Sequence, residues 1–287
     1  EKPIAINPVE ADRTIESAKR AGKVFAVMLQ MRTERPYRIA RKAIQDGVIG
    51  ELMRTEMVAA YYRNQAYYDS AEWRATWIGE GGGVLVNQAP HALDMFCWLA
   101  GLPSKVTAST RTRLHEIEVE DEAFAVLEYA NGAHGYLYTT TNEAPGTTRF
   151  EIAGDKGKVV VSDGQVTIRR VVPPIREFTF NTTEMWSGPQ TEPVEVNVED
   201  MPAGHAQITR NFARAILYGE PLLAPGEEGI WCVELASSII LSSKRAKTVS
   251  LPVDRAEYDA LLKELRAGSQ PKRRVLGQRV SDPNIVR

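Results

Sequence analysis

The sequence has 287 residues, of which 43% are hydrophobic and 25% are charged. This composition excludes an intrinsically disordered chain and predicts a globular protein that buries a sizeable core and can form two domains. The 35 basic and 37 acidic residues almost cancel. Since the only strongly basic run is short, at 272–274, we expect no binding to nucleic acid.

Two cysteines occur, Cys97 and Cys232, each within an apolar helical pattern. We expect buried free thiols in a reducing compartment rather than a disulfide framework, which favours the cytoplasm. The longest apolar stretch, 24–29, is too short to cross a bilayer, and the first residues show no signal-peptide pattern. We therefore expect no membrane association.

The first fifty residues predict the end of a parallel α/β unit. Asn7 is a suitable N-cap for a helix that ends at Gly22. Residues 23–30 form a continuous apolar run, which is typical of a strand buried on both faces. A second helix is expected over about 36–43 and slightly beyond, so the order is helix, buried strand, helix.

Beyond residue 50 the pattern predicts a sheet. Residues 52–62 alternate like a half-buried strand, and a Gly-rich loop at 81–83 leads into a helix over about 89–99. Short strands separated by Asn-Gly, Asp-Lys-Gly and Asp-Gly turns then predict an antiparallel meander. These strands are expected at 106–113, 123–129, 135–141, 149–153, 158–162 and 166–171.

The C-terminal third predicts three helices, over 205–218, 230–247 and 254–267. We expect helices to cover one face of the sheet, as in an α+β domain. The polar, Pro-containing tail after the last helix is expected to wrap around a neighbour or to be mobile.

Two short stretches carry most of the functional information. One is Glu1-Lys2-Pro3, and the other runs from Gly81 to Asp94 as Gly-Gly-Gly-Val-Leu-Val-Asn-Gln-Ala-Pro-His-Ala-Leu-Asp. Together they resemble the glucose-fructose oxidoreductase, inositol dehydrogenase and rhizopine-catabolism (Gfo/Idh/MocA) family of oxidoreductases. Its members show Glu-Lys-Pro after the fourth strand of a nucleotide domain and a Gly-Gly-Gly stretch leading to Asp-x-Gly-x-His-x-x-Asp. The resemblance is colinear over nearly the whole chain.

The resemblance implies a fold class of α/β plus α+β. A Rossmann-type dinucleotide-binding domain would precede an open, mainly antiparallel β-sheet domain covered by helices on one face. No Gly-x-Gly-x-x-Gly turn lies between a strand and a helix here, so we expect that turn upstream of Glu1. On this view the sequence is a fragment or an incomplete record of a longer protein, and alone it should bind nicotinamide cofactor poorly. Its expected parts are 1–33, a remnant of the dinucleotide-binding domain; 34–253, the substrate-binding and oligomerisation domain; and 254–287, a C-terminal helix and tail.

The activity implied by the resemblance is hydride transfer between NAD or NADP and a secondary alcohol of a sugar, inositol or related polyol. Such a reaction needs a group that takes the hydroxyl proton, and Lys2 and His91 are the candidates. His91 follows a proline in a first helical turn, where the helix dipole favours a neutral imidazole. Lys2, at the carboxyl end of a parallel strand, would lie beside the nicotinamide and polarise the reacting oxygen.

Asn87 is the third expected catalytic residue, since its amide can hydrogen-bond a substrate hydroxyl. It stands where the family motif has its first aspartate, and Ala89 replaces the motif's glycine. The loss of that carboxylate puts in doubt any mechanism in which it pairs with His91. Structural interpretations also remain: a histidine in a first turn is often a cap or a satisfied core group, and a lysine after a strand is ordinarily solvated. Asp94 is expected to orient His91 or its loop.

Further residues are expected to line the site. Arg32 would contact the cofactor or substrate hydroxyls, or form a surface pair with Glu34. Trp73 and Arg74 would cover the nicotinamide and bind its phosphates, or anchor a loop. The expected cofactor contacts are thus Glu1, Lys2, Arg32, Trp73 and Arg74, and the expected substrate contacts are Met31, Arg63, Asn87 and His91. An aromatic cluster beside Arg63 suits stacking on a sugar or ordinary packing; it consists of Tyr61, Tyr62, Tyr67 and Tyr68.

The remaining histidines predict no metal site. His115 and His134 are expected at the surface near strand ends and His205 at a helix start, and none has the spacing of a metal ligand. A second class of function is a non-catalytic sugar-binding or regulatory paralogue, which would give no change in absorbance at 340 nm with polyols. The open sheet face is expected to form a homodimer or homotetramer, as it does in the family.

Overall fold

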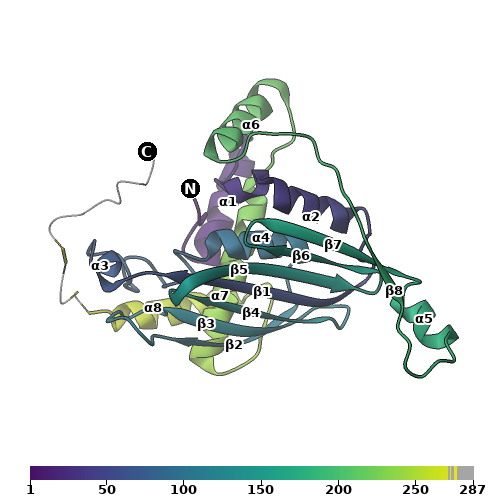
Figure 1. Cartoon of the computed structure of the whole chain (residues 1–287). Helices are drawn as coiled ribbons and strands as arrows, with labels where there is room; N and C mark the ends of the chain where they lie inside the picture. Colours follow the sequence, from purple (N-terminus) through teal and green to yellow (C-terminus); the bar gives the residue numbers. More distant parts are fainter. Residues whose placement is uncertain (271, 273–274, 277–287) are drawn as a thin grey trace.

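A computed structural model describes residues 1–270, 272 and 275–276 of the chain. Predictions for the rest of the polar tail lie outside these residues. Within the described part, nine strands form one sheet, and several helices lie above it in Figure 1. The strands are β1 (Leu52–Tyr62), β2 (Lys105–Arg111), β3 (Glu122–Glu128), β4 (His134–Thr140), β5 (Asn142–Gly154), β6 (Gly157–Ser162), β7 (Gln165–Val172), β8 (Gln190–Pro193) and β9 (Val249–Ser250).

The order of the strands is β8-β7-β6-β5-β1-β4-β3-β2-β9. All pairs are antiparallel except β1 and β4, which are parallel. The open, mainly antiparallel sheet is therefore confirmed, but the simple meander is wrong because β1 lies between β4 and β5. Alternation of apolar residues specifies which side chains face the core and not which strand lies alongside, so the local pattern contained no signal for this insertion.

The helices are α1 (Pro8–Ala21), α2 (Arg35–Gln45), α3 (Gln65–Tyr68), α4 (Pro90–Ala100), α5 (Ile175–Asn181), α6 (His205–Tyr218), α7 (Ile230–Arg245) and α8 (Arg255–Ala267), with 3-10 turns η1 (Gln30–Thr33) and η2 (Gly226–Gly229). Helices α2, α4 and α7 contact the sheet directly. The predicted first helix is confirmed with its caps: Asn7 Oδ1 accepts from the backbone N–H of Glu10, and Gly22 has a left-handed backbone.

The predicted strand over 23–30 is wrong for this structure. Only an isolated bridge joins Ala26 to Pro225. The apolar side chains are buried instead in a small second cluster, where Val27 and Leu29 pack with Ile208. The segment reaches its apolar partners without the neighbouring strands that a ladder of hydrogen bonds requires.

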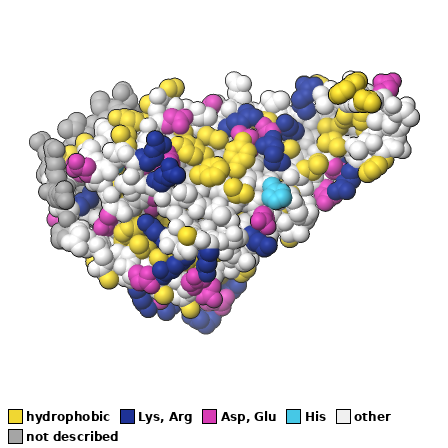
Figure 2. Space-filling model, turned by 90° about the horizontal axis from the view of Figure 1, so that it is seen from below, with side chains coloured by type: hydrophobic (Ala, Val, Ile, Leu, Met, Phe, Trp, Pro, Cys, Tyr) yellow, Lys and Arg dark blue, Asp and Glu magenta, His cyan; other side chains and the backbone are white. Residues whose placement is uncertain are grey.

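The sheet face turned away from α2, α4 and α7 is open. Along β3, Ala123, Ala125 and Leu127 are buried, whereas Phe124 and Val126 on the opposite face are 45% and 44% exposed. Viewed from below, hydrophobic side chains lie beside groups of acidic and basic ones (Figure 2). No helix among the described residues has the length and apolarity needed to cross a membrane.

Candidate functional site

The loop that precedes α4 is held by a buried carboxylate. Glu120 Oε1 accepts hydrogen bonds from the backbone N–H groups of Gly83 and Leu85, at 2.8 and 3.2 Å. A Cβ atom at position 83 would lie 1.8 Å from the carbonyl oxygen of Glu120, so only glycine fits there. Burial raises the Glu120 pKa to about 7, against the hydrogen bonds that it accepts. This anchoring fixes the path of the chain into Asn87 and His91.

The structure brings Lys2 to this loop. Lys2 Nζ donates to the backbone carbonyl of Asn87 over 2.9 Å. Burial lowers the Lys2 pKa, and interactions with Cys232, Glu1 and Glu80 oppose that effect in part. Two residues 85 positions apart in the sequence are thus joined by one hydrogen bond.

His91 lies in the first turn of α4, as predicted. Its Nε2 atom is 3.1 Å from Gln30 Nε2, while His91 Nδ1 and Gln30 Oε1 are buried without a partner among the described residues. An amide offers a donor or, after a half-turn, an acceptor, so Gln30 can stabilise either tautomer of the neutral ring. Burial, followed by the charges of Lys2 and His205, lowers the His91 pKa to about 4. The imidazole is therefore neutral at pH 7.

The side chain of Asn87 faces Glu80 and Tyr67. Its Nδ2 atom donates to Glu80 Oε1, and its Oδ1 atom accepts from the Tyr67 hydroxyl over 3.1 Å. The same hydroxyl accepts from Arg74 Nη1 at 2.6 Å and from Gln88 Nε2 at 3.1 Å. Asn87 thus belongs to a network of polar side chains, and no hydrogen bond among the described residues joins its side chain to His91.

Trp73 and Arg74 lie at the margin of this network. The Arg74 guanidinium lies 4.3 Å from the Tyr67 ring centroid and 4.6 Å from that of Trp73, whose side chain is 47% exposed. Arg74 Nε also donates to Ser70. These contacts hold the Arg74 side chain against its own loop, and the expected cofactor contacts of Trp73 and Arg74 stay predictions.

Arg32 requires a correction. It does not pair with Glu34: its Nε and Nη2 atoms donate to the two oxygens of Asp94 at 3.0 and 2.6 Å, and Nη1 donates to Glu228. The side chain is 1% exposed, and its guanidinium carbon lies 5.5 Å from the Trp98 ring centroid and 5.7 Å from that of Trp231. These contacts use three of the five N–H donors of its guanidinium, and the expected cofactor contact of Arg32 stays a prediction. Asp94, expected to orient His91 or its loop, binds Arg32.

Other predicted contacts lie further out. Glu1 is exposed, and Met31 packs against the main core. Arg63 places its guanidinium 5.3 Å from the Tyr67 ring centroid and donates to the carbonyl of Tyr62. It therefore borders the Asn87 network without a hydrogen bond to it.

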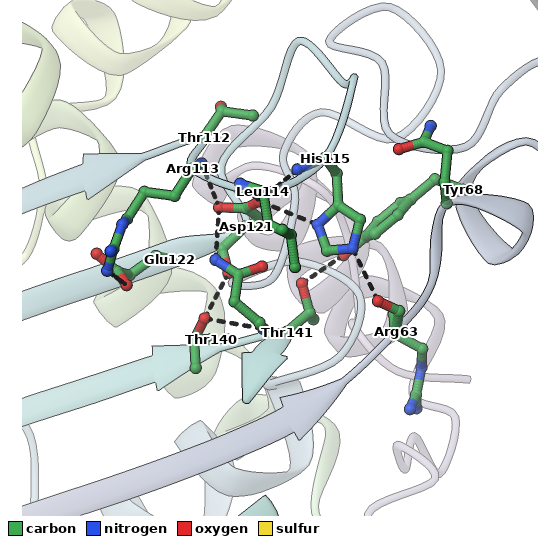
Figure 3. Close-up of polar contacts among 12 residues, drawn as sticks. Arg63, Tyr68, Thr112, Arg113, Leu114, His115, Asp121, Glu122, Thr140 and Thr141 are labelled. Carbon is green, nitrogen blue, oxygen red and sulfur yellow. Dashed lines mark hydrogen bonds and ion pairs between the residues drawn. The ribbon is translucent and has the colours of Figure 1, made fainter. Parts of the chain in front are cut away.

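His115 is buried, so its predicted surface position is wrong. Its Nδ1 atom lies 3.0 Å from Asp121 Oδ2, and its Nε2 atom lies 2.7 Å from the carbonyl of Arg63 (Figure 3). Nearby, the hydroxyls of Tyr68 and Thr141 are 2.6 Å apart. The cluster ties the loop after β2 to the end of β1 and so supports the segment that carries Arg63. His205 begins α6, as predicted.

The sequence interpretation missed Gln30 and Glu80. Gln30 is a polar residue directly after a long apolar run, which is a usable signal for a site at that point. An acidic residue before three glycines resembles an ordinary solvated loop, so Glu80 gave no signal. Among the described residues, no group of three or more His, Cys, Asp or Glu side chains could hold a metal ion. Cys97 and Cys232 are free and buried, as expected.

Residues 37–160 match the GFO/IDH/MocA C-terminal domain, which confirms the resemblance seen in the motifs. Myo-inositol 2-dehydrogenase from Thermotoga maritima is 22% identical over 257 residues, covering 88% of this chain and 71% of the relative. The NADP(+)-dependent scyllo-inositol 2-dehydrogenase IolW from Bacillus subtilis is 22% identical over 263 residues, with the same coverage of both chains.

Solved structures show the same fold. The WlbA dehydrogenase from Bordetella pertussis, in complex with NADH and UDP-GlcNAcA, superposes with a TM-score of 0.72 at 26% identity. The match covers 88% of this chain and 71% of that one. The predicted fold class, an open sheet with helices on one face, is thereby confirmed.

Proposed function

We propose that this protein is an NAD(P)-dependent oxidoreductase, because its residues 37–160 match the GFO/IDH/MocA C-terminal domain. Its substrate would be a secondary alcohol of a sugar, an inositol or a related polyol. The observation that carries the proposal is the placement of Lys2 and His91: both are half-buried beside the loop of Asn87, and the charge of Lys2 lowers the His91 pKa. The relatives support it, since they are named as inositol dehydrogenases and one solved neighbour binds NADH.

The unpartnered polar atoms fit a polyol. His91 Nδ1 and Gln88 Oε1 are buried and have no hydrogen-bond partner among the described residues. Buried polar atoms are costly when unpaired, and adjacent hydroxyl groups can donate to such atoms and accept from them. This pattern favours a ligand with several hydroxyls over an apolar one.

The nicotinamide end of NAD(P) fits the same residues. Lys2 and the exposed indole of Trp73 would hold it, with Arg74 behind the indole. When bound, the cofactor supplies the acceptor or donor of hydride. Binding and orientation of the substrate, and transfer of its proton, belong to the side chains of this protein.

His91 is the proposed base. With its pKa of about 4 the ring is neutral at pH 7. A half-turn of the Gln30 amide, which lies 3.1 Å from His91 Nε2, would let its oxygen accept from Nε2–H and leave Nδ1 to take the hydroxyl proton. The Lys2 ammonium, held by the Asn87 carbonyl, would donate to the reacting oxygen as negative charge develops on it. Asn87 and Gln88 would orient neighbouring hydroxyls.

The test uses the intact protein with NAD or NADP and a panel of inositols, aldoses and glycosides, followed at 340 nm. We expect Lys2→Ala and His91→Ala to lower the single-turnover rate by about 10²–10⁴-fold, the usual contribution of an acid-base residue. His134→Ala, at the exposed start of β4, is the matched control. Variants of Lys2 and His91 with wild-type rates would contradict the assignment. Polyol binding by calorimetry without any absorbance change would favour the non-catalytic paralogue.

We also propose that the open sheet face mediates self-association. Phe124 and Val126 place exposed apolar surface on that face, and Figure 2 shows charged groups beside such patches. Light scattering on Phe124→Lys should show a shift towards monomer; an unchanged mass would contradict this interface.

A further inference from the structure

The amide of Asn87 is held by a carboxylate that lies outside the sequence motif. Asn87 Nδ2 donates to Glu80 Oε1, and Tyr67 donates to Asn87 Oδ1 over 3.1 Å. An ionised carboxylate only accepts hydrogen bonds, so the amide nitrogen must face Glu80. The backbone carbonyl of Asn87 accepts from Lys2 Nζ. Glu80, Asn87 and Lys2 therefore form one continuous chain of contacts.

Glu80 is fixed in place and largely withdrawn from water. It is 6% exposed, and its Oε2 atom accepts from the backbone N–H of Ala75 over 2.6 Å. Ala75 has a φ of 57°, a left-handed conformation that is unfavourable for a residue other than glycine. Burial raises the Glu80 pKa, against the hydrogen bonds from Ala75 and Asn87. The charges of Arg74 and Lys272 also favour its ionised form.

Position 87 itself carries an amide, so it contributes no charge to the site. Among the acidic groups that act on Lys2 are Glu1, which is exposed, and Glu80, which is buried. Glu80 is also the carboxylate that hydrogen bonds from Ala75 and Asn87 hold in place. We propose that Glu80 is a positioning residue of the reaction centre, which orients the Asn87 amide and supplies through it the negative charge that residue 87 lacks.

This inference rests on the proposed function and deepens it. The Glu80 carboxylate favours the charged form of Lys2, which is the form that donates to the reacting oxygen. It also fixes the direction in which the Asn87 amide faces. Glu80 touches neither the substrate nor the cofactor in this scheme, so its effect passes through Asn87 and Lys2.

A purely local role for Glu80 would be to cap the strained turn at Ala75. Two variants separate the roles. In Glu80→Gln the new amide can accept from only one of its two present donors, so the contact with Asn87 or with Ala75 is lost. In the double variant Glu80→Gln with Asn87→Asp, the amide at position 80 can accept from Ala75 and donate to the carboxylate at position 87. Tyr67 then donates to the other oxygen of that carboxylate, so the double variant keeps every hydrogen bond and moves the charge to position 87.

The readout is the pKa of Lys2, measured by NMR on ¹³C-methylated lysines in the intact protein and assigned with Lys2→Arg. The groups that face Lys2 are Glu1, Glu80, Cys232 and His91, and only Glu80 is changed. We expect Glu80→Gln to lower the Lys2 pKa and the double variant to return it to the wild-type value. In parallel, kcat/KM should fall about ten- to hundredfold in Glu80→Gln, as for the loss of a hydrogen bond to a charged group, and recover in the double variant.

Glu120→Gln is the matched control. Glu120 is similarly buried and holds the same loop, but its hydrogen bonds go to Gly83 and Leu85 and not to Asn87, so the Lys2 pKa should not change. The proposal is overturned if the Lys2 pKa is unchanged in folded Glu80→Gln. It is also overturned if the Lys2 pKa of the double variant is as low as that of the single variant. If Glu80→Gln does not fold, the Lys2 pKa of the double variant is the test. The proposal requires that value to equal the wild-type value. The NMR result needs no substrate, so an inactive protein whose Lys2 responds would reject the proposed function and keep the role of Glu80.

Discussion

Arg32 joins η1 to α4 and η2, and its removal should strongly destabilise the fold. Its Nε and Nη2 atoms bind Asp94 at 3.0 and 2.6 Å, and both residues are 1% exposed. Although burial lowers the Arg32 pKa, the hydrogen bonds and charges of Asp94 and Glu228 raise it on balance. Arg32→Met would leave the Asp94 carboxylate buried without a cation. Breaking such a pair costs about 3–5 kcal/mol, a large part of the about 5–15 kcal/mol that stabilises a typical domain.

The measurement is the free energy of unfolding in urea, for Arg32→Met, Asp94→Leu and the double variant. We expect each single change to lower it by about 3–5 kcal/mol and the double variant to recover much of the loss, since Glu228 is 30% exposed and can turn to water. Lys42→Met, which breaks an exposed pair with Asp46, should change it by about 0.5 kcal/mol or less. A loss below about 1 kcal/mol in Arg32→Met, or additive single effects, would refute the reasoning.

Three further predictions concern pH and packing. The His91 pKa of about 4 lies below the ordinary 6.5, so between these values the unfolded chain binds a proton that the folded chain does not. The free energy of unfolding should therefore fall from pH 7 to pH 5, and it should fall less in His91→Gln. The same pH dependence in the wild type and in His91→Gln would contradict this. Gly83→Ala should lower the free energy of unfolding by about 1–3 kcal/mol or more, because the added Cβ would collide with the backbone of Glu120. Gly188→Ala, with open space around its Cβ, should leave the Tm nearly unchanged. Asp121 has its pKa lowered because accepted hydrogen bonds outweigh burial, so Asp121→Asn should cost about 1.5–3 kcal/mol at pH 7. That cost should disappear as the pH falls through the lowered pKa, and a cost independent of pH would count against it.

Much of the secondary structure could be predicted because its signals are local. The first helix and α6 end at Gly22 and Gly219, each in a left-handed conformation, and β1 has the predicted bounds of 52–62. The place of β1 between β4 and β5 could not be predicted, because strand pairing depends on residues far apart in the sequence. The apolar run at 23–30 misled for a related reason: burial and strand pairing give the same pattern in the sequence.

Some residues of the candidate site could likewise be predicted from the sequence, and others could not. Lys2 and Asn87 belong to recognisable motifs, and the structure joins them by a hydrogen bond. Arg32 was identified as a site residue from its position after an apolar run, but its charge serves a buried ion pair. A sequence shows that a charged residue is present. Whether that residue binds a ligand or forms a buried ion pair depends on which groups surround it in the fold.

The motif residues depend on partners that the motif does not contain. Asn87 is oriented by Glu80, and His91 contacts Gln30, whose turn is held by the pair of Arg32 with Asp94. A chain can therefore keep Lys2, Asn87 and His91 and still lose their geometry through one change at a partner. We expect this network to need one carboxylate, at either position 80 or position 87. A protein with an amide at position 87 then needs an acid at position 80, whereas a protein with an acid at position 87 does not. The two positions should then be exchangeable only together, as the double variant tests.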